Sequence, residues 1–181
     1  MRDMSDTIET LPILLVPDPL LKARAKPVRE EDMDRVRALL PRIFATMYRA
    51  PGIGLAAPQV GVSLRFAVVD VAPDNKRSPI VLINPDIVAR SEELATREEG
   101  CLSLPGQYAD VTRPARVTVR FTGADGARQQ LDAEGLLGAC IQHEIDHLDG
   151  VLFIDHLSAL KRNMILRRLA KELRQKRTEA M

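Results

Sequence analysis

The sequence predicts an α+β domain, with antiparallel or mixed strands packed around a central helix that carries the motif HEIDH. Strand patterns form one block in the middle of the chain, and helical patterns flank this block, including an N-terminal helix and an amphipathic C-terminal helix. The length of 181 residues and the hydrophobic content of 45% suit one domain with its own core. We expect residues 1–157 to form the main body and residues 158–181 to form a basic C-terminal helix and tail of the same domain.

The N-terminal part of the chain is expected to hold one helix. Residues 1–10 are polar and are expected to be frayed. Three prolines within residues 17–28 predict extended chain and turns. Between about residues 30 and 49 apolar side chains recur at helical spacing, namely Met33, Val36, Leu40, Ile43 and Met47. This pattern predicts an amphipathic helix, and Pro41 inside it is expected to start a new turn or to kink the helix.

The remaining elements follow in order. Residues 51–62 are rich in glycine and are expected to form a loop. Strands are expected at residues 65–71, 79–85 and 115–121. A second helix is expected over residues 133–148, with Asp132 as its N-terminal cap and Gly150 just past its end. A third helix is expected over about residues 158–176.

Composition excludes several classes of protein. No apolar run approaches the roughly 18–20 residues that span a bilayer, so we expect no membrane partner. The first ten residues contain acidic side chains and no apolar stretch, unlike a secretory signal. Two cysteines, Cys101 and Cys140, are too few for a disulfide framework at this size. These observations predict a cytoplasmic protein, which we expect to be a monomer.

Charge is unevenly spread along the chain, although the net charge is only +1. Residues 158–181 contain eight basic and two acidic side chains, a net charge of +6, whereas the preceding residues carry −5. This asymmetry indicates an anionic partner for the C-terminal segment alone.

The string QHEIDHLDG, residues 142–150, is the most informative part of the sequence. His143 and His147 are four residues apart, so on a helix they lie one turn apart on the same face and can bind one metal ion. Glu144 beside them can act as a general base toward a water molecule that the metal activates. The alternative is two surface histidines that have this spacing by chance. The motif favours the metal site, because the chain contains only three histidines.

A catalytic metal needs a third protein ligand and one open position. The candidate is Cys101 in EEGCLSLPG, because a thiolate and two imidazoles suit zinc or another borderline-soft divalent ion. The alternative is a small buried hydrophobic residue, which fits Cys140 in the middle of its helix better than Cys101. Leu136 and Cys140 extend the stripe of the two histidines, and they predict an apolar wall beside the metal for a hydrophobic side chain of a substrate.

The segment GIGLAAPQVG, residues 52–61, has neither of the usual phosphate-binding contexts. It lacks the lysine of a phosphate-binding loop, and it follows a helix and precedes a strand, unlike a dinucleotide-binding motif.

Taken in order, GIGLAAPQ, EGCLS and HEIDH resemble the three signature motifs of the peptide deformylases, and the resemblance covers about residues 14–156. It implies a metal-dependent hydrolase that removes the formyl group from the N-formyl-methionine of nascent polypeptides and releases formate.

The resemblance also implies roles for individual residues. It implies that residues 1–157 are the catalytic deformylase domain, that the metal ligands are Cys101, His143 and His147, and that Glu144 is the general acid and base. Gln59 and the backbone N–H of Leu102 are implied to bind the carbonyl oxygen of the substrate. The implied substrate pocket is formed by Ile53, Gly54, Gly100, Leu136 and Cys140. The implied metal is ferrous iron, with zinc, nickel or cobalt as alternatives, and the basic C-terminal helix is implied to dock on the ribosome.

Two further points remain open at the level of sequence. Glu99 and Arg113 either form a buried ion pair behind the cysteine ligand or are two solvated charges. The HEIDH motif is also shared with zinc endopeptidases, but the chain lacks the spaced downstream ligand of that class. A non-enzymatic module with a structural metal is the other alternative, although no fourth ligand is evident for it.

Overall fold

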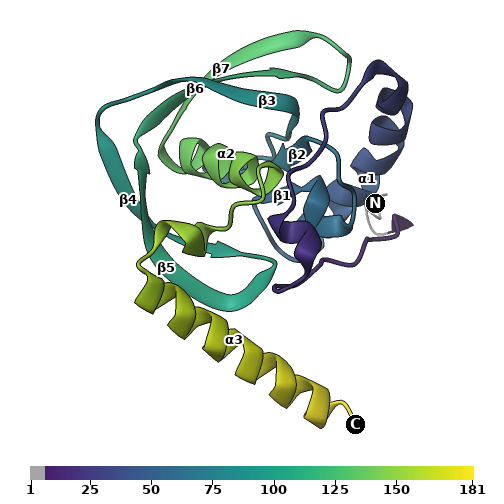
Figure 1. The fold of residues 1–181 in the computed structure, drawn as a ribbon. Helices are drawn as coiled ribbons and strands as arrows, with labels where there is room; N and C mark the ends of the chain where they lie inside the picture. Colours follow the sequence, from purple (N-terminus) through teal and green to yellow (C-terminus); the bar gives the residue numbers. More distant parts are fainter. Residues whose placement is uncertain (1–6) are drawn as a thin grey trace.

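The structure is a computed structural model that describes residues 7–181 (Figure 1). Its antiparallel five-stranded sheet has the order β1 (Gly54–Ala56), β2 (Phe66–Val69), β3 (Ile80–Arg90), β6 (Arg116–Thr122) and β7 (Arg128–Glu134). A second, two-stranded sheet consists of β4 (Leu94–Cys101) and β5 (Leu104–Pro114). The long helices are α1 (Met33–Arg49), α2 (Gly135–Leu148) and α3 (Ala159–Glu179). The predicted α+β class is confirmed.

The two sheets are joined by one long, bent antiparallel pair of chain segments. β3 continues into β4 after a short turn, and β5 continues into β6. Backbone hydrogen bonds from Ser91 to Arg116 and from Ala115 to Glu93 carry the pairing across the bend. Figure 1 shows α2 in the middle of this arrangement, with β3, β6 and β7 on one side and β4 and β5 on the other. The helix with the HEIDH motif is therefore central, as predicted.

Burial explains why α2 takes this place. Its apolar residues pack against the inner face of the five-stranded sheet in one core cluster, which includes Val69, Leu82, Val117, Val119, Phe121, Cys140, Ile141 and Ile145. Gly138 lets the helix approach the end of β7, since a Cβ at this position would lie 2.9 Å from the carbonyl oxygen of Ala133. An alanine there would require the helix or the strand to move.

The strand predictions were incomplete. β2, β3 and β6 correspond to the predicted strands, but β3 runs on to Arg90. Four strands were not predicted, namely β1, β4, β5 and β7. Residues 51–62, expected as a loop, contain β1 and a 3-10 turn over Ala57–Val60. These strands lie at sheet edges or in the two-stranded sheet, where many side chains are polar and exposed and the apolar alternation is weak.

The helix boundaries also differ from the expected ones. Ala133 is the penultimate residue of β7, and α2 begins at Gly135 in a left-handed conformation with φ 59°. Asp132 does not cap the helix, because its carboxylate accepts a hydrogen bond from the Thr118 hydroxyl at 2.7 Å. α1 begins at residue 33 and continues through Pro41 as one helix.

Two predictions concern the ends of the chain. Residues 1–6 lie outside the described residues, and of the remaining residues expected to be frayed, Glu9 pairs with Arg42 of α1 at 3.7 Å. At the other end the Ser158 hydroxyl caps α3, and Ile165 and Leu169 are buried in the same core cluster as Leu104, Val111, Leu152, Phe153 and Ile154. Ala170, on the same helix, is exposed. No helix within residues 7–181 is long and apolar enough to cross a membrane.

Candidate active site

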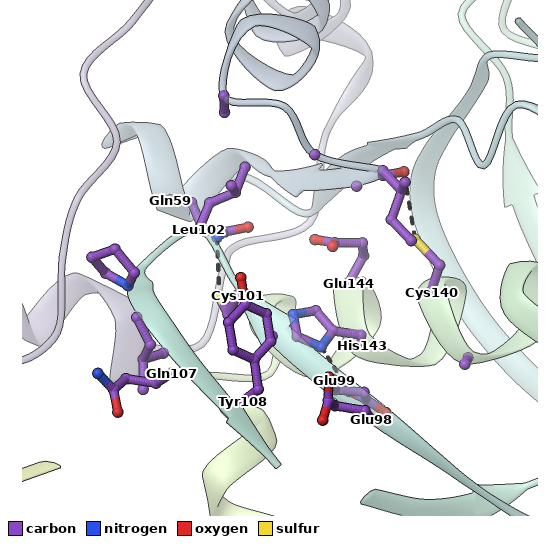
Figure 2. Close-up of a pocket in the computed structure, with 18 of the residues that line it drawn as sticks. Gln59, Glu98, Glu99, Cys101, Leu102, Gln107, Tyr108, Cys140, His143 and Glu144 are labelled. Atoms are coloured by element: carbon purple, nitrogen blue, oxygen red, sulfur yellow. Dashed lines mark hydrogen bonds and ion pairs between the residues drawn. The ribbon is translucent and has the colours of Figure 1, made fainter. Parts of the chain in front are cut away.

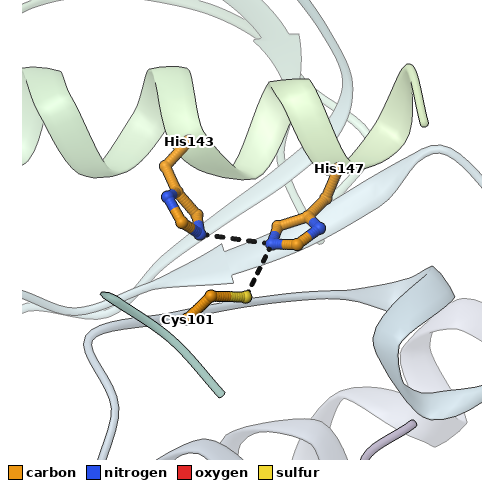
Figure 3. Close-up of side chains that lie close together, drawn as sticks. All are labelled: Cys101, His143 and His147. Carbon is orange, nitrogen blue, oxygen red and sulfur yellow. Dashed lines mark hydrogen bonds between the residues drawn. The ribbon is translucent and has the colours of Figure 1, made fainter. Parts of the chain in front are cut away.

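Three side chains converge where the end of β4 faces α2 (Figure 3). His143 and His147 project from successive turns of α2, and their Nε2 atoms are 3.2 Å apart. Cys101 ends β4, and its Sγ lies 3.3 Å from Nε2 of His147. The three donor atoms lie within 4.8 Å of one another. The helical spacing of the histidines and the strand end that carries the cysteine thus bring the predicted ligand set together.

This donor set fits a divalent transition metal. Two imidazole nitrogens and a thiolate are ligands for zinc, iron and similar ions, and imidazole binds such an ion in its neutral form. Burial, followed by the charges of His143 and Arg113, holds the pKa of His147 well below its usual range, which suits a neutral ligand. Burial also lowers the pKa of His143, but hydrogen bonds with Cys101 and Glu99 outweigh this effect and raise it to about 10, so a bound metal ion would replace the proton on this imidazole. Three ligands leave a position open for a water molecule or a substrate, as in catalytic sites.

A network of charged side chains supports the ligands from behind. Glu99 accepts a hydrogen bond from Nδ1 of His143 at 2.9 Å and two bonds from Arg113, at 2.7 and 2.9 Å. Arg113 also donates to Asp146 at 2.8 Å, and Asp146 contacts His156 at 2.7 Å. Burial raises the pKa of Glu99, but the bonds from His143 and Arg113 outweigh this effect and lower it to about 2. Glu99 is therefore a carboxylate that orients His143, as is usual for metal-binding histidines.

The buried pair settles the choice between an ion pair and two solvated charges. The side chains of Arg113 and Glu99 are 7% and 9% exposed. Asp146 joins this pair, because Arg113 reaches it from β5. An arginine with two carboxylates in this geometry fixes β4 and β5 to α2 at the level of the ligands.

Glu144 is buried beside the ligands without a hydrogen-bond partner for one of its oxygens. The residue is 3% exposed, and its Oε2 has no partner among the described residues. Burial, opposed in part by the charge of His143, raises the pKa of Glu144 to about 7. Gly54 makes room for this carboxylate, because a Cβ there would lie 2.5 Å from Oε1 of Glu144 and 2.9 Å from Sγ of Cys140. A carboxyl group with a pKa near neutrality can both take and return a proton.

Gln59 points its amide group at the cysteine. Its Oε1 accepts a hydrogen bond from the backbone N–H of Ala56 at 3.0 Å, and its Nε2 donates to the Ser103 hydroxyl at 3.1 Å and lies 3.6 Å from Sγ of Cys101. These contacts fix the orientation of the amide. Leu102 follows the cysteine at the turn between β4 and β5, so the side-chain N–H of Gln59 and the backbone of Leu102 both lie at the site.

A cleft of about 630 Å³ opens beside the ligands (Figure 2). Cys140, His143 and Glu144 of α2 form one wall, and the turn with Cys101 and Leu102 forms another. The predicted substrate-contacting residues Ile53, Gly54, Gly100, Leu136 and Cys140 all line it. Burial raises the pKa of the Cys140 thiol well above its usual range, so this cysteine is a neutral, apolar wall residue.

Several residues that line the cleft were not identified from the sequence. Four of them lie on the hairpin of β4 and β5, namely Arg97, Glu98, Gln107 and Tyr108. Tyr108 pairs with Gly100, and its ring lies over that glycine, because a Cβ there would be 2.5 Å from the ring. The only sequence signal for these residues is their nearness to EGCLS along the chain. The register of the hairpin brings them to the cleft, and that register is not evident from polar edge strands.

Comparisons with known proteins give one consistent result. The family model described as polypeptide deformylase matches residues 10–163. A peptide deformylase of Agrobacterium fabrum is 49% identical over 166 residues, which cover 91% of this chain and 97% of that protein. A peptide deformylase of a Bradyrhizobium strain is 54% identical over 164 residues, which cover 88% of this chain and 93% of that protein.

Solved structures agree with these matches. A peptide deformylase from Legionella pneumophila has a TM-score of 0.85 and 47% identity, with 92% of this chain and 97% of that chain covered. The peptide deformylase from Ehrlichia chaffeensis in complex with actinonin has a TM-score of 0.86 and 37% identity, with 91% and 98% covered. The chain therefore belongs to the polypeptide deformylase family and is a hydrolase that removes N-formyl groups from nascent peptides.

Proposed function

We propose that the cleft is the deformylation site and that Glu144 carries the proton during hydrolysis. The observation on which this depends is a buried carboxylate oxygen without a partner, in the same cleft as three convergent metal donors. A buried acceptor of this kind is costly unless a ligand or water uses it. A proton carrier next to an activated water molecule accounts for its presence.

We propose Cys101, His143 and His147 as the ligands of one divalent metal ion. When bound, the metal supplies an activated water molecule by lowering its pKa toward neutrality. Ferrous iron is the proposed ion, with zinc, nickel and cobalt as alternatives that suit the same donors. Metal analysis of protein purified without oxygen, paired with an assay of formate release, tests this. A full equivalent of another metal in the active protein would contradict the choice of iron. Formate release by metal-free protein would contradict the metal site itself.

The chain's own groups account for the proton and charge transfers. Glu144 takes the proton of the attacking water and later delivers it to the departing amine, as its pKa of about 7 allows. Negative charge then grows on the former carbonyl oxygen of the formyl group. The amide N–H of Gln59 and the backbone N–H of Leu102 donate to that oxygen, and loss of one such donor typically costs about 2.7–4 kcal/mol in the transition state. The products are formate and a free α-amino group.

The methionine side chain is proposed to lie along Ile53, Gly54, Leu136 and Cys140. Cys140→Trp is expected to raise KM for formyl-methionyl peptides or to abolish turnover while the metal is retained, because the indole fills the cleft. Overpacking at this buried position also costs roughly 1–3 kcal/mol of stability, so circular dichroism and metal content are measured first. Unchanged kinetics in a folded, metal-loaded variant would place Cys140 outside the pocket.

We propose that α3 positions the enzyme on the ribosome, in the cytoplasm. One face of α3 is buried against the body, and its basic residues Arg167, Arg168, Lys171 and Arg174 are all exposed. Figure 1 shows the C-terminal end of α3 extending away from the sheets. Ribosomal RNA offers a dense phosphate surface, and contacts with phosphates need only lysine and arginine.

Reversal of this charge is expected to separate ribosome binding from hydrolysis. Changing the four basic residues to glutamate should weaken co-sedimentation with ribosomes, with a steep dependence on salt, while activity on short formyl peptides stays near that of the wild type. A matched control changes four exposed basic residues on other elements, namely Lys76, Arg90, Arg120 and Arg128. Equal binding by the α3 variant and the wild type at low salt would leave α3 as a solvated surface helix.

A further inference from the structure

Arg97 lies at the end of the cleft that is farthest from the metal donors along α2. Successive side chains of a strand point to opposite faces, so in β4 the side chain of Arg97 lies on the same face as those of Glu99 and Cys101. Its Nη2 lies 3.8 Å from the position that a Cβ would take on Gly135, the first residue of α2. The side chain lines the cleft together with Leu136 and Cys140. A permanent positive charge thus stands where the apolar stripe of α2 begins.

The guanidinium of Arg97 has no partner among the described residues. Arg113 and Arg116, on the strands that follow, both pair with carboxylates at 2.7–2.8 Å. No hydrogen bond or ion pair within residues 7–181 involves the side chain of Arg97, and the residue is exposed. Its five N–H donors are therefore available to a molecule in the cleft.

The length of the stripe indicates which part of a substrate reaches Arg97. Leu136 precedes His143 by seven residues, which is about 10 Å along the helix axis at 1.5 Å per residue. Suppose that the formyl group of a substrate lies at the metal donors and that its first side chain follows the stripe. The tip of that side chain then lies beside Leu136. At this position the tip contacts the guanidinium of Arg97, since apolar residues do not close this end of the cleft.

We propose that Arg97 extends the substrate range of the cleft to N-formyl-methionine sulfoxide, an inference that rests on the proposed site and its methionine pocket. A sulfoxide oxygen is a strong hydrogen-bond acceptor, whereas the thioether sulfur of methionine is a weak one. In an apolar pocket the sulfoxide would lose its hydration without replacement. Here the guanidinium donates to it, and the reaction remains hydrolysis of the formyl amide.

A second charge in the lining of the cleft favours a neutral acceptor over an anion. Glu98, which follows Arg97 in β4, also lines the cleft, so a substrate carboxylate that enters the cleft meets a negative charge as well as the guanidinium. A sulfoxide is dipolar but carries no net charge, and it accepts from Arg97 without that repulsion. Methionine sulfoxide combines this chemistry with the length of methionine.

The experiment compares formate release from three peptides that differ only in the first residue: formyl-methionine sulfoxide, formyl-norleucine and formyl-glutamate, each followed by Ala-Ser. In Arg97→Leu the ratio of kcat/KM for the sulfoxide to that for norleucine should fall about tenfold, since one charge-assisted hydrogen bond is lost. Arg97→Lys, which keeps the charge, should restore part of the ratio. Arg35→Leu removes an exposed arginine near the start of α1 and should leave the ratio at the wild-type value.

The outcomes separate this inference from the proposed function. An Arg97→Leu ratio equal to that of the wild type, in a variant with unchanged thermal unfolding, would overturn the role of Arg97. A greater loss for formyl-glutamate than for the sulfoxide would show that Arg97 selects anions and would overturn the choice of a neutral acceptor. If wild-type enzyme loaded with metal released no formate from formyl-methionyl peptides, the proposed site itself would fail.

Discussion

Glu144→Ala is expected to keep a full equivalent of metal and to lose nearly all formate release. The three donor atoms come from other residues, so the variant retains the ligand set. It loses the group that takes the proton of the attacking water, and general acid–base catalysis typically contributes about 10²–10⁴-fold in rate. Metal content and formate release are measured on the same preparation, so that loss of activity cannot reflect loss of metal.

Glu144→Gln provides the matched control, because it keeps the shape of the side chain and removes the proton carrier. Both variants should be inactive, since the amide cannot exchange the proton. Metal loss in the alanine variant would make Glu144 a ligand or a determinant of the ligand geometry. Near-normal activity in the glutamine variant would assign the proton transfer to another group.

Cys101→Ala should lose metal and activity together. The thiolate is one of three donors, and removal of a charged donor from a three-ligand site weakens metal retention strongly. We expect far less than one equivalent of metal after dialysis against a chelator under conditions that leave the wild type loaded. Addition of excess metal should restore little activity.

The second cysteine serves as the control for this variant. Cys140→Ala removes a buried thiol that is held neutral in the wall of the cleft, and it should retain the metal. A full equivalent of tightly held metal in Cys101→Ala would show that the cysteine is not the third ligand. If the Cys140 variant lost the metal and the Cys101 variant kept it, Cys140 would be the ligand and Cys101 would not.

The fold could be predicted as far as apolar periodicity reached. β2 is buried at every position and β6 alternates buried and exposed residues, so both appear in the sequence. β7 has only one buried side chain, Ala133, and as an edge strand it needs no second apolar face. The start of α2 was misjudged because a left-handed glycine, Gly135, separates it from the strand, and this turn gives no periodic signal.

The site could be predicted where the chemistry lies within a short motif. The i, i+4 spacing places His143 and His147 together on any helix, and their neighbour Glu144 follows. The partners of Asp146 and the position of Arg97 depend on contacts between the hairpin and α2, which are remote in sequence. Such contacts follow from strand register and tertiary packing, which no local pattern encodes.

The positions of the metal ligands link metal binding to the stability of the folded protein. Cys101 and His147 are 46 residues apart in sequence and belong to different elements, so an ion shared by them closes a long loop. A ligand that binds only the folded state raises the free energy of unfolding. The increase is about 2.7 kcal/mol when the concentration of free ligand is 100 times its dissociation constant. Scarcity of the ion would therefore act twice, because it removes catalytic centres and also exposes a larger share of the molecules to proteolysis.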